Sequence, residues 1–379
     1  MIRCEIVDSG HRLEELEAAW HALWLRSGAG IFQSYHWVSG WWTRGQAERL
    51  HIALAWDRDE LVAVLPLAVL RWHGARILQW AAQSVSDYCD GLSTSEDALR
   101  QLWTMVHRRG GFDIVRLKNV RHDAAIRPIL RATVAPGKPD DACLQVVSQW
   151  SQSGDGWFRS LNKKKRSNHA RGERMLADMG KVTVRQILDH PPPALIARLS
   201  ELKEQWRQAN GLASTCDAAT LAALVAALDK IGALMIMVLE CDERVVAGSI
   251  NAVHGGRLLA YFATYDPAVA RASPGIMLMT HYIRWALDNA ITEIDFLRGE
   301  EVYKFEFANT VITLDAFLAG RTVAGRCILG LYRLSQAARR LTRFPGTEDL
   351  KPTIGSAYFT EKGTPRRPAR TKTTEGIAA

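Results

Sequence analysis

The chain has 379 residues, more than one hydrophobic core usually supports, and 47% are hydrophobic, so its composition predicts two domains followed by a tail. Its six cysteines are scattered singly, which excludes paired zinc or redox motifs and a disulfide-dense secreted scaffold. The formal net charge is +8, and residues 157–185 hold nine Arg or Lys against Glu173 and Asp178, a local +7.

The first half of the chain predicts a domain of mixed strands and helices over residues 1–150. Apolar and β-branched runs predict strands at 4–7, 51–56, 61–70, 77–81, 113–118 and 142–147. Apolar residues at helical spacing predict helices around 13–23 and 95–108. Trp37, Trp41 and Trp42 also lie at helical spacing, which predicts core packing, with a stacking surface for a sugar or a base as the alternative.

A polar loop follows the predicted strand at 77–81. It carries Asp87, Tyr88 and Asp90, two carboxylates and a phenol after a strand end. Such groups can bind a polar substrate through hydrogen bonds or accept a proton. They can equally cap neighbouring backbone groups, as Asp residues in loops often do.

A basic helix over residues 151–180 is predicted to connect the two halves. Lys163, Lys164, Lys165 and Arg166 are four consecutive cations that repel one another, which favours an anionic ligand over a merely solvated face. Lys165 and Arg166 are therefore candidate substrate-binding residues. Aromatic residues do not interleave with these cations, and this argues against general nucleic-acid binding.

The second half, residues 181–343, repeats the alternation of strands and helices. Strands are predicted at 182–187, 234–239, 245–253, 257–265, 294–297 and 311–318, with helices at 195–208, from 218, from 275 and at 327–341. Gly255 and Gly256 supply the torsions of a hairpin between 245–253 and 257–265. Residues 344–379 turn to Pro, Thr, Gly and charged residues without periodicity, which predicts a disordered tail.

The start of the helix near residue 275 is a candidate anion site. Ser273 is a good N-cap, Pro274 suits the first helical position, and Gly275 leaves the amides around Ile276 uncovered by a side chain. A helix N-terminus of this kind binds phosphate, and Arg271 would add a full positive charge. An ordinary capped helix is the alternative.

The order of these motifs resembles a known family. The second half resembles the CelD-type, FemAB-like branch of the GNAT acyltransferase superfamily. The resemblance rests on a hairpin, then Arg271-x-Ser-Pro-Gly, then a helix, and then Ile294-Asp-Phe-Leu-Arg-Gly-Glu-Glu-x-Tyr-Lys. Phe32-Gln33 with Trp37 and Trp41, Ser86-Asp-Tyr88 and the basic helix extend the resemblance over residues 5–330. It implies α/β architecture, with tandem GNAT-like domains that each form a mixed sheet flanked by helices. The loop after Arg271 departs from the usual GNAT spacing of glycines.

The resemblance also implies site roles and a cosubstrate. Acyl-CoA would be bound by Arg271, Ser273, Gly275, Ile276 and Arg298. Tyr303 would be the general acid, Lys304 would stabilise developing negative charge, and Asp295, Glu300 and Glu301 are candidate bases.

The first functional hypothesis is an acyl-CoA-dependent N- or O-acyltransferase that acts on a sugar, polysaccharide or cell-envelope precursor. The second is a Fem-type ligase that takes an aminoacyl group from aminoacyl-tRNA. The third is a non-catalytic module that binds a nucleotide or a polysaccharide-synthesis complex, which the variant loop favours.

No metal motif, Walker motif or nucleophile elbow is present, so no metal cofactor is expected. The most apolar stretch, 218–239, is interrupted by Asp229 and Lys230, so no transmembrane segment is expected. The N-terminus lacks the pattern of a secretory signal, which predicts a cytoplasmic location, with peripheral contact to the inner membrane as a further option.

Overall fold

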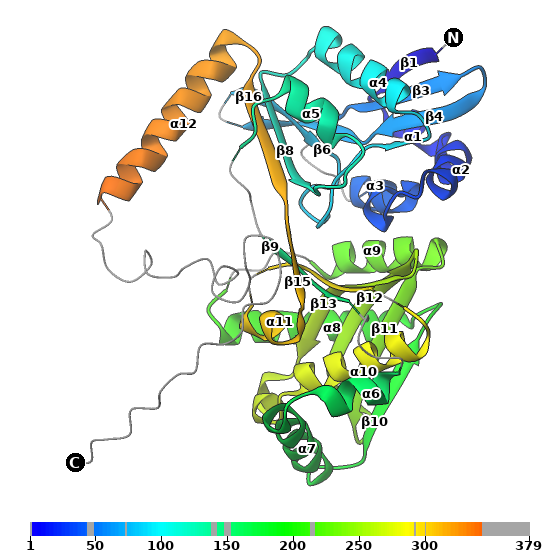
Figure 1. The fold of residues 1–379 in the computed structure, drawn as a ribbon, viewed down its shortest axis with the longest axis vertical. Coiled ribbons are helices and arrows are strands. Elements are labelled where there is room, and N and C mark those ends of the chain that lie inside the picture. The colour runs from blue at the N-terminus through cyan, green and yellow to red at the C-terminus, as the bar shows by residue number, and fades with distance from the viewer. Residues whose placement is uncertain are drawn as a thin grey trace.

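A computed structural model describes residues 2–43, 49–72, 74–137, 142–147, 153–212, 217–291, 293–299 and 301–342. Over these residues the chain forms three β-sheets covered by helices, with the N-terminal half above the C-terminal half in Figure 1. The predicted α/β architecture with mixed sheets flanked by helices is confirmed. The predicted tail, 344–379, lies outside the described residues.

The N-terminal half builds two of the sheets. Their orders are β1-β3-β4-β7 and β16-β8-β6-β5-β2. The elements up to residue 147 are β1 (Ile2–Val7), α1 (Gly10–Glu14), α2 (Glu17–Ser27), η1 (Ile31–Gln33), α3 (Tyr35–Trp42), β2 (Arg49–Leu50), β3 (Ile52–Asp57), β4 (Glu60–Leu65), β5 (Leu67–Trp72), β6 (Ala75–Trp80), β7 (Leu92–Ser93), α4 (Glu96–Arg109), β8 (Ile114–Val120), α5 (Arg127–Thr133) and β9 (Ala142–Val147).

Pro66 divides what the sequence predicts as one strand over residues 61–70. It separates β4 from β5, which belong to different sheets. Because proline has no backbone N–H, it cannot continue a hydrogen-bonded ladder. The backbone N–H of His51, between β2 and β3, donates to the Leu67 carbonyl at 2.9 Å. The chain therefore passes from one sheet to the other at neighbouring positions, between β2 and β3 and between β4 and β5.

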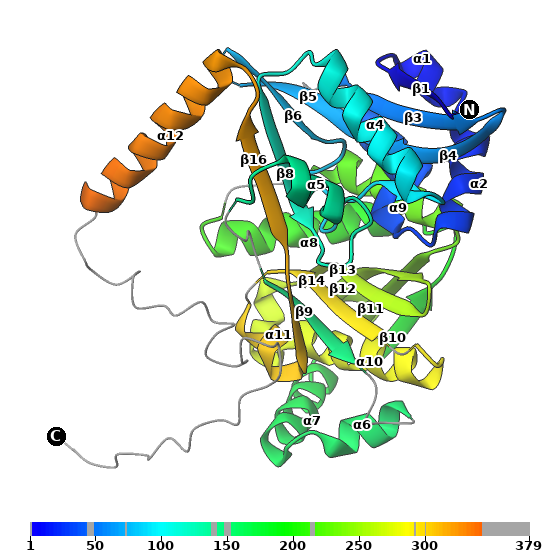
Figure 2. The ribbon, with the colours of Figure 1, turned by 45° about the horizontal axis from the view of Figure 1, so that its top comes forward.

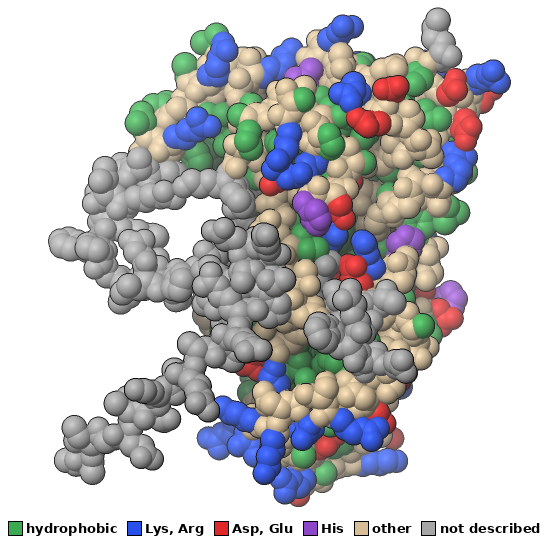
Figure 3. Space-filling view, viewed as in Figure 1, with side chains coloured by type: hydrophobic (Ala, Val, Ile, Leu, Met, Phe, Trp, Pro, Cys, Tyr) green, Lys and Arg blue, Asp and Glu red, His purple; other side chains and the backbone are tan. Residues whose placement is uncertain are grey.

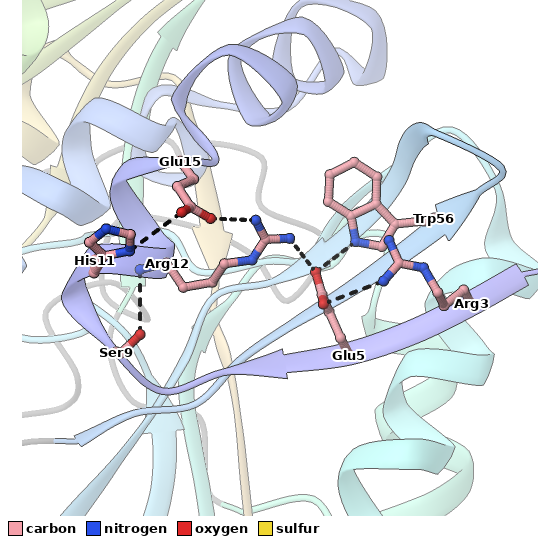
Figure 4. Close-up of polar contacts among 7 residues, drawn as sticks. All are labelled: Arg3, Glu5, Ser9, His11, Arg12, Glu15 and Trp56. Carbon is pink, nitrogen blue, oxygen red and sulfur yellow. Dashed lines mark hydrogen bonds and ion pairs between the residues drawn. The ribbon is translucent and has the colours of Figure 1, made fainter.

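A polar network ties the first strand to the first helix (Figure 4). Glu5 on β1 accepts hydrogen bonds from Arg12 on α1 and from the indole N–H of Trp56 on β3, both at 3.0 Å. Arg12 also donates to Glu15 at 2.6 Å. The ions are partly exposed, so the network fixes the position of α1 more than it adds to stability.

The C-terminal half builds a seven-stranded sheet. Its order is β10-β11-β12-β13-β14-β9-β15. The elements from residue 153 are α6 (Gly154–Ser160), α7 (Lys163–Ala177), β10 (Val182–Ile187), α8 (Pro193–Ala209), α9 (Ala218–Lys230), β11 (Leu234–Cys241), β12 (Arg244–His254), β13 (Arg257–Tyr265), η2 (Pro267–Ala272), α10 (Pro274–Asp288), β14 (Glu293–Arg298), α11 (Val302–Phe307), β15 (Thr310–Thr313), β16 (Asp315–Gly320) and α12 (Val323–Thr342).

Helices cover both faces of this sheet, because its strands are apolar on both sides. On β11, Ile236 and Val238 pack on the side of α8 and α9, whereas Met235, Met237 and Leu239 pack on the side of α7 and α10. The two sets alternate along the strand, as side chains of a β-strand do. The predicted hairpin and the helix after it are found as β12, β13 and α10.

Each half of the chain gives a strand to the sheet of the other half. β9 lies between β14 and β15 in the seven-stranded sheet, and β16 pairs with β8 in the N-terminal half. In Figures 1 and 2 the segment β15–β16 runs from the lower sheet up to β8. The single strand expected over 311–318 is therefore two strands in two sheets, a correction to its expected place at the end of the second half.

The two halves also share one hydrophobic core. Trp37 and Trp41 on α3 are 0% and 1% exposed and belong to the same buried cluster as Leu224 and Leu228 on α9. Gly40 lies at this contact between the helices, because a Cβ there would be 3.4 Å from the Ala223 carbonyl oxygen. Trp37 and Trp41 therefore pack in the core as predicted, whereas Trp42 is half-buried at the edge of this cluster.

Among the described residues, none of the helices has both the length and the apolar character needed to cross a membrane. Residues 218–239 form α9 and most of β11, so this apolar stretch is divided between a helix and a strand.

Candidate functional site

The candidate site lies where two neighbouring parallel strands stop pairing. β13 and β14 pair over a short stretch, in which Arg257 to Leu259 lie opposite Glu293 to Asp295. Beyond this point β14 bulges against β9, and Leu297 takes a left-handed conformation with φ of 57°. Parallel strands that separate beside a helix N-terminus open a place for a ligand between them.

The start of α10 presents the predicted anion-binding residues. Arg271 and Ser273 are exposed, and Gly275 and Ile276 are half-buried. The Ser273 side chain caps no N–H group, and its φ of 53° is left-handed. Its carbonyl accepts hydrogen bonds from Ile276 and Met277, at 3.0 and 3.1 Å. The aromatic ring of Tyr265 lies beside Gly275, so β13 and the helix start form one surface.

The helix α11 carries the predicted acid. Tyr303 is 36% exposed, and its buried surroundings and the nearby Glu301 raise the pKa of its hydroxyl. It lies close enough to Tyr282 on α10 for its charge to raise the pKa of that buried residue further. The phenol of Tyr303 therefore stays protonated at neutral pH, as a general acid requires.

Lys304 holds the turn before α11. Its Nζ donates to the Arg298 carbonyl at 2.6 Å and lies 2.8 Å from Glu301, and the residue is 5% exposed. Gly299 has φ of 123°, and a side chain on it would lie 2.8 Å from Nζ, so the tight turn needs glycine. Glu300 lies outside the described residues.

Lys203 on α8 is a residue of this site that the sequence reasoning missed. Its Nζ donates to the Ala263 carbonyl on β13 at 2.9 Å and stacks over Trp206 and Phe262. Burial, with help from the positive charges of Arg207 and Lys304, lowers the pKa of Lys203 to about 8. Nothing in the sequence around Lys203 signals this, because the burial comes from residues some sixty positions away on β13.

Asp295 belongs to a buried cluster between the halves. It is 0% exposed, and it accepts hydrogen bonds from the Tyr88 hydroxyl at 2.6 Å and from the Leu297 N–H at 2.7 Å. Arg121 lies 3.7 Å from Asp295 and stacks on the Tyr88 ring. The structure thus brings the predicted residues Tyr88 and Asp295 together across the molecule. A carboxylate with these partners is suited to positioning the strands rather than to reaching a substrate.

The loop with Tyr88 is held by residues of the N-terminal motif. Gln33 donates to the Tyr88 carbonyl at 3.0 Å, and the indole of Trp37 donates to Ser86 at 2.9 Å. Burial raises the pKa of Asp90 to about 7, although it accepts backbone hydrogen bonds from Gly91, Ala125 and Ile126 that favour its charged form. Asp90 therefore caps backbone groups, the alternative role that the sequence left open.

A cavity of about 440 Å³ lies beside this loop, between the two halves. Tyr88, Asp90, Arg121 and Arg257 are among its lining residues. The cavity meets β13 near Leu259, where pairing with β14 ends. Asp87 is half-buried and does not line it.

The cations of the basic run divide into two pairs. Lys165 contacts the Glu306 carbonyl, lies 3.8 Å from its carboxylate and stacks over Phe307 at 4.4 Å. Arg166 donates to Leu161 at 2.7 Å. Lys163 and Lys164 are exposed, and Figure 3 shows Lys and Arg gathered at the lower end of the molecule, where α6 and α7 lie.

Comparison with known proteins identifies the C-terminal half. Residues 163–305 match the family described as the acetyltransferase (GNAT) domain. FemX has a similar structure, with a TM-score of 0.54 at 10% identity over 82% of this chain and 96% of FemX. A search of curated protein sequences finds no match.

Two further solved structures have a similar fold. The C-terminal domain of a lysylphosphatidylglycerol synthetase from Agrobacterium fabrum has a TM-score of 0.53 at 11% identity, over 84% of this chain and 95% of that domain. L-PGS from Bacillus licheniformis has a TM-score of 0.52 at 11% identity, over 85% and 96%. The predicted resemblance is confirmed: residues 163–305 match a GNAT-type acetyltransferase domain, and the fold of the chain is similar to that of FemX.

Proposed function

We propose that the chain is an acyltransferase that moves an acyl group from acyl-CoA to an amine or hydroxyl of a sugar, polysaccharide or cell-envelope precursor. The observation that carries the proposal is that an exposed helix start follows β13 and an exposed tyrosine follows β14, the two strands that separate. Arg271 and Ser273 lie at the helix start, and Tyr303 lies on α11. The GNAT match over residues 163–305 supports the choice of donor.

The reaction needs a phosphate-binding group, a base and an acid. The acceptor amine attacks the thioester carbonyl carbon, a C–N bond forms, the C–S bond breaks, and the amine loses a proton. Tyr303, protonated at neutral pH, would give a proton to the departing thiolate. Lys203, with a pKa of about 8, would take up the proton from the amine in its neutral form.

The acceptor is assigned to the cavity between the halves. Its volume of about 440 Å³ and its Arg121 and Arg257 side chains suit a polar molecule the size of a sugar. Tyr88 and Asp295 would fix the wall between this cavity and β14 through their hydrogen bond. Donor and acceptor would thus approach β13 from opposite ends.

The alternative donor is aminoacyl-tRNA. Lys163 and Lys164 favour it, because they are exposed in the first turn of α7 and carry no acidic residue beside them there. FemX and a lysylphosphatidylglycerol synthetase have the same fold, and the second name describes the making of an aminoacylated lipid. In this case the basic end of α7 would contact the phosphate backbone.

Binding of the two donors separates these options. The purified chain is titrated with CoA and, separately, with aminoacyl-tRNA, using Arg271→Ala and the control Arg108→Ala, which removes an exposed cation on α4. We expect CoA to bind, Arg271→Ala to weaken binding about tenfold, and Arg108→Ala to have no effect. Binding of aminoacyl-tRNA alone would favour the alternative, and binding of neither donor would favour the non-catalytic module.

A further inference from the structure

Three side chains of the kinds that bind metals meet between α7 and α10, about two helical turns after the start of α10. His169 and Glu173 lie one turn apart on α7, so they share a face of that helix. His281 faces them from α10, with its ring centroid 6.0 Å from that of His169. One ligand atom from each of the three residues lies within 4.8 Å of the other two.

His169 is poorly satisfied by the protein around it. The residue is 7% exposed, and its Nε2 has no hydrogen-bond partner among the described residues. Its Nδ1 is 3.5 Å from Glu173, longer than a normal hydrogen bond. A buried ring nitrogen without a partner is unfavourable, and a bound cation would remove that penalty.

The charge state of the cluster suits metal binding. Glu173 supplies the negative charge that a cation needs, on an exposed carboxylate. Arg284 on α10 is a nearby cation whose positive charge would repel a metal ion. Its guanidinium is paired with Asp155 and stacked on Phe158, so its charge is largely neutralised.

We propose that His169, Glu173 and His281 bind a divalent transition-metal ion of the zinc type that joins α7 to α10. Two imidazole nitrogens and one carboxylate are a common ligand set for zinc, with a fourth position left for water. Glu173 is exposed, so its carboxylate can move toward the rings as the ion binds. The ion would hold α7 where Gly172 packs against the Ala272 carbonyl, next to the start of α10.

The test measures metal binding by the full chain, with no acyl-transfer assay. Protein stripped of metal is titrated with Zn²⁺ by calorimetry and with Co²⁺ by visible absorption, whose bands report the coordination geometry. All proteins carry Cys327→Ser, because Cys327 is an exposed thiol that could bind zinc. The variants are Glu173→Gln and His281→Gln.

A matched control comes from α1. His11 and Glu15 have the same i, i+4 spacing, 3.4 Å apart, but are exposed and belong to no three-residue cluster of this kind among the described residues. We expect one equivalent to bind to the parent protein and to Glu15→Gln, and affinity to fall about tenfold or more in Glu173→Gln and His281→Gln.

The proposal fails if Glu173→Gln and His281→Gln bind like the parent protein, or if the parent binds no metal at micromolar concentrations. If His281→Gln does not fold, Glu173→Gln decides the matter, because Glu173 is exposed and its replacement leaves packing intact.

Discussion

Single side chains at the separating strands have environments that the residue type alone does not predict. Lys304 looks like a free cation in the sequence, yet it is buried and bonded to the Arg298 carbonyl. Tyr303, its neighbour, keeps 36% of its surface exposed. At this scale the sequence predicts which residue types occur in the site, whereas their exposure and partners depend on residues that are distant in the chain.

The tyrosine is tested by removing its hydroxyl. If Tyr303 protonates the leaving group, Tyr303→Phe lowers kcat by roughly 10²- to 10⁴-fold and leaves the affinity for the donor nearly unchanged. Release of free thiol from acyl-CoA measures kcat. The control is Tyr332→Phe, an exposed tyrosine on α12. Unchanged turnover in Tyr303→Phe would remove this residue from the mechanism.

Lys203 is tested through the pH dependence of stability. Because the folded pKa, about 8, lies below the unfolded value of about 10.4, the unfolded chain binds more protons between these pH values. Stability therefore rises with pH from about 8 to 10.4 relative to Lys203→Met, which lacks this group. Urea unfolding of both proteins measures the difference, which is of the order of 1–3 kcal/mol. A difference independent of pH would show that Lys203 has an ordinary pKa.

The hydrogen bond from Tyr88 to Asp295 is tested by comparing its loss with the loss of a hydrogen bond between uncharged groups in the same region. Tyr88→Phe removes a hydrogen bond to a buried carboxylate and should cost roughly 1.5–3 kcal/mol of unfolding free energy. Tyr261→Phe removes a hydrogen bond to the Val85 carbonyl and should cost roughly 0.5–1.5 kcal/mol. Denaturant unfolding gives both values, and equal losses would contradict a charged partner for Tyr88.

Individual elements were largely predictable, whereas their partners in the sheets were not. The hairpin β12–β13 and helix α10 follow from Gly255, Gly256 and the apolar pattern around them. The sequences of β9 and β16 predict that each is a strand, but they do not predict which sheet each strand joins. The break at Leu161 and Asn162 between α6 and α7 was also missed, although Asn162 caps α7 by accepting from the Lys165 N–H at 2.9 Å.

Helix α7 begins with cations at the positive end of its own dipole. The first turn of α7 holds no acidic residue to offset Lys163 and Lys164, so replacing both with Gln should raise the unfolding free energy by a few tenths of a kcal/mol. The same change should weaken binding of the anionic donor, with a smaller effect at high salt. Calorimetry at two salt concentrations checks this, and unchanged binding would show that the exposed pair is only solvated.

The neighbouring Lys165 is the control for that experiment. Lys165→Met loses the contacts with Glu306 and Phe307 and should lower the unfolding free energy by about 0.5–1 kcal/mol. If the unfolding free energy rises for the Lys163 and Lys164 replacement and falls for Lys165→Met, the first two cations face the ligand and Lys165 is packed against α11.

The whole molecule should unfold as one unit, because the halves share a core and exchange strands. The calorimetric and van't Hoff enthalpies of thermal unfolding are expected to agree, as in a two-state transition. Two separated transitions would show that the halves are independent domains. The sequence predicts two halves from length and element order, but a shared core depends on helix faces such as those of α3 and α9, which meet only in the folded chain.

The exchange of strands also sets an order of events during synthesis on the ribosome. The edge of β8 is complete only when residues 315–320 have emerged, and β9 must wait for β14, made some 150 residues later. A nascent chain of about 300 residues therefore exposes an unpaired strand edge that can pair with other chains. Emergence of residues 315–320, rather than completion of the first half, is the step at which the open edge of β8 is covered.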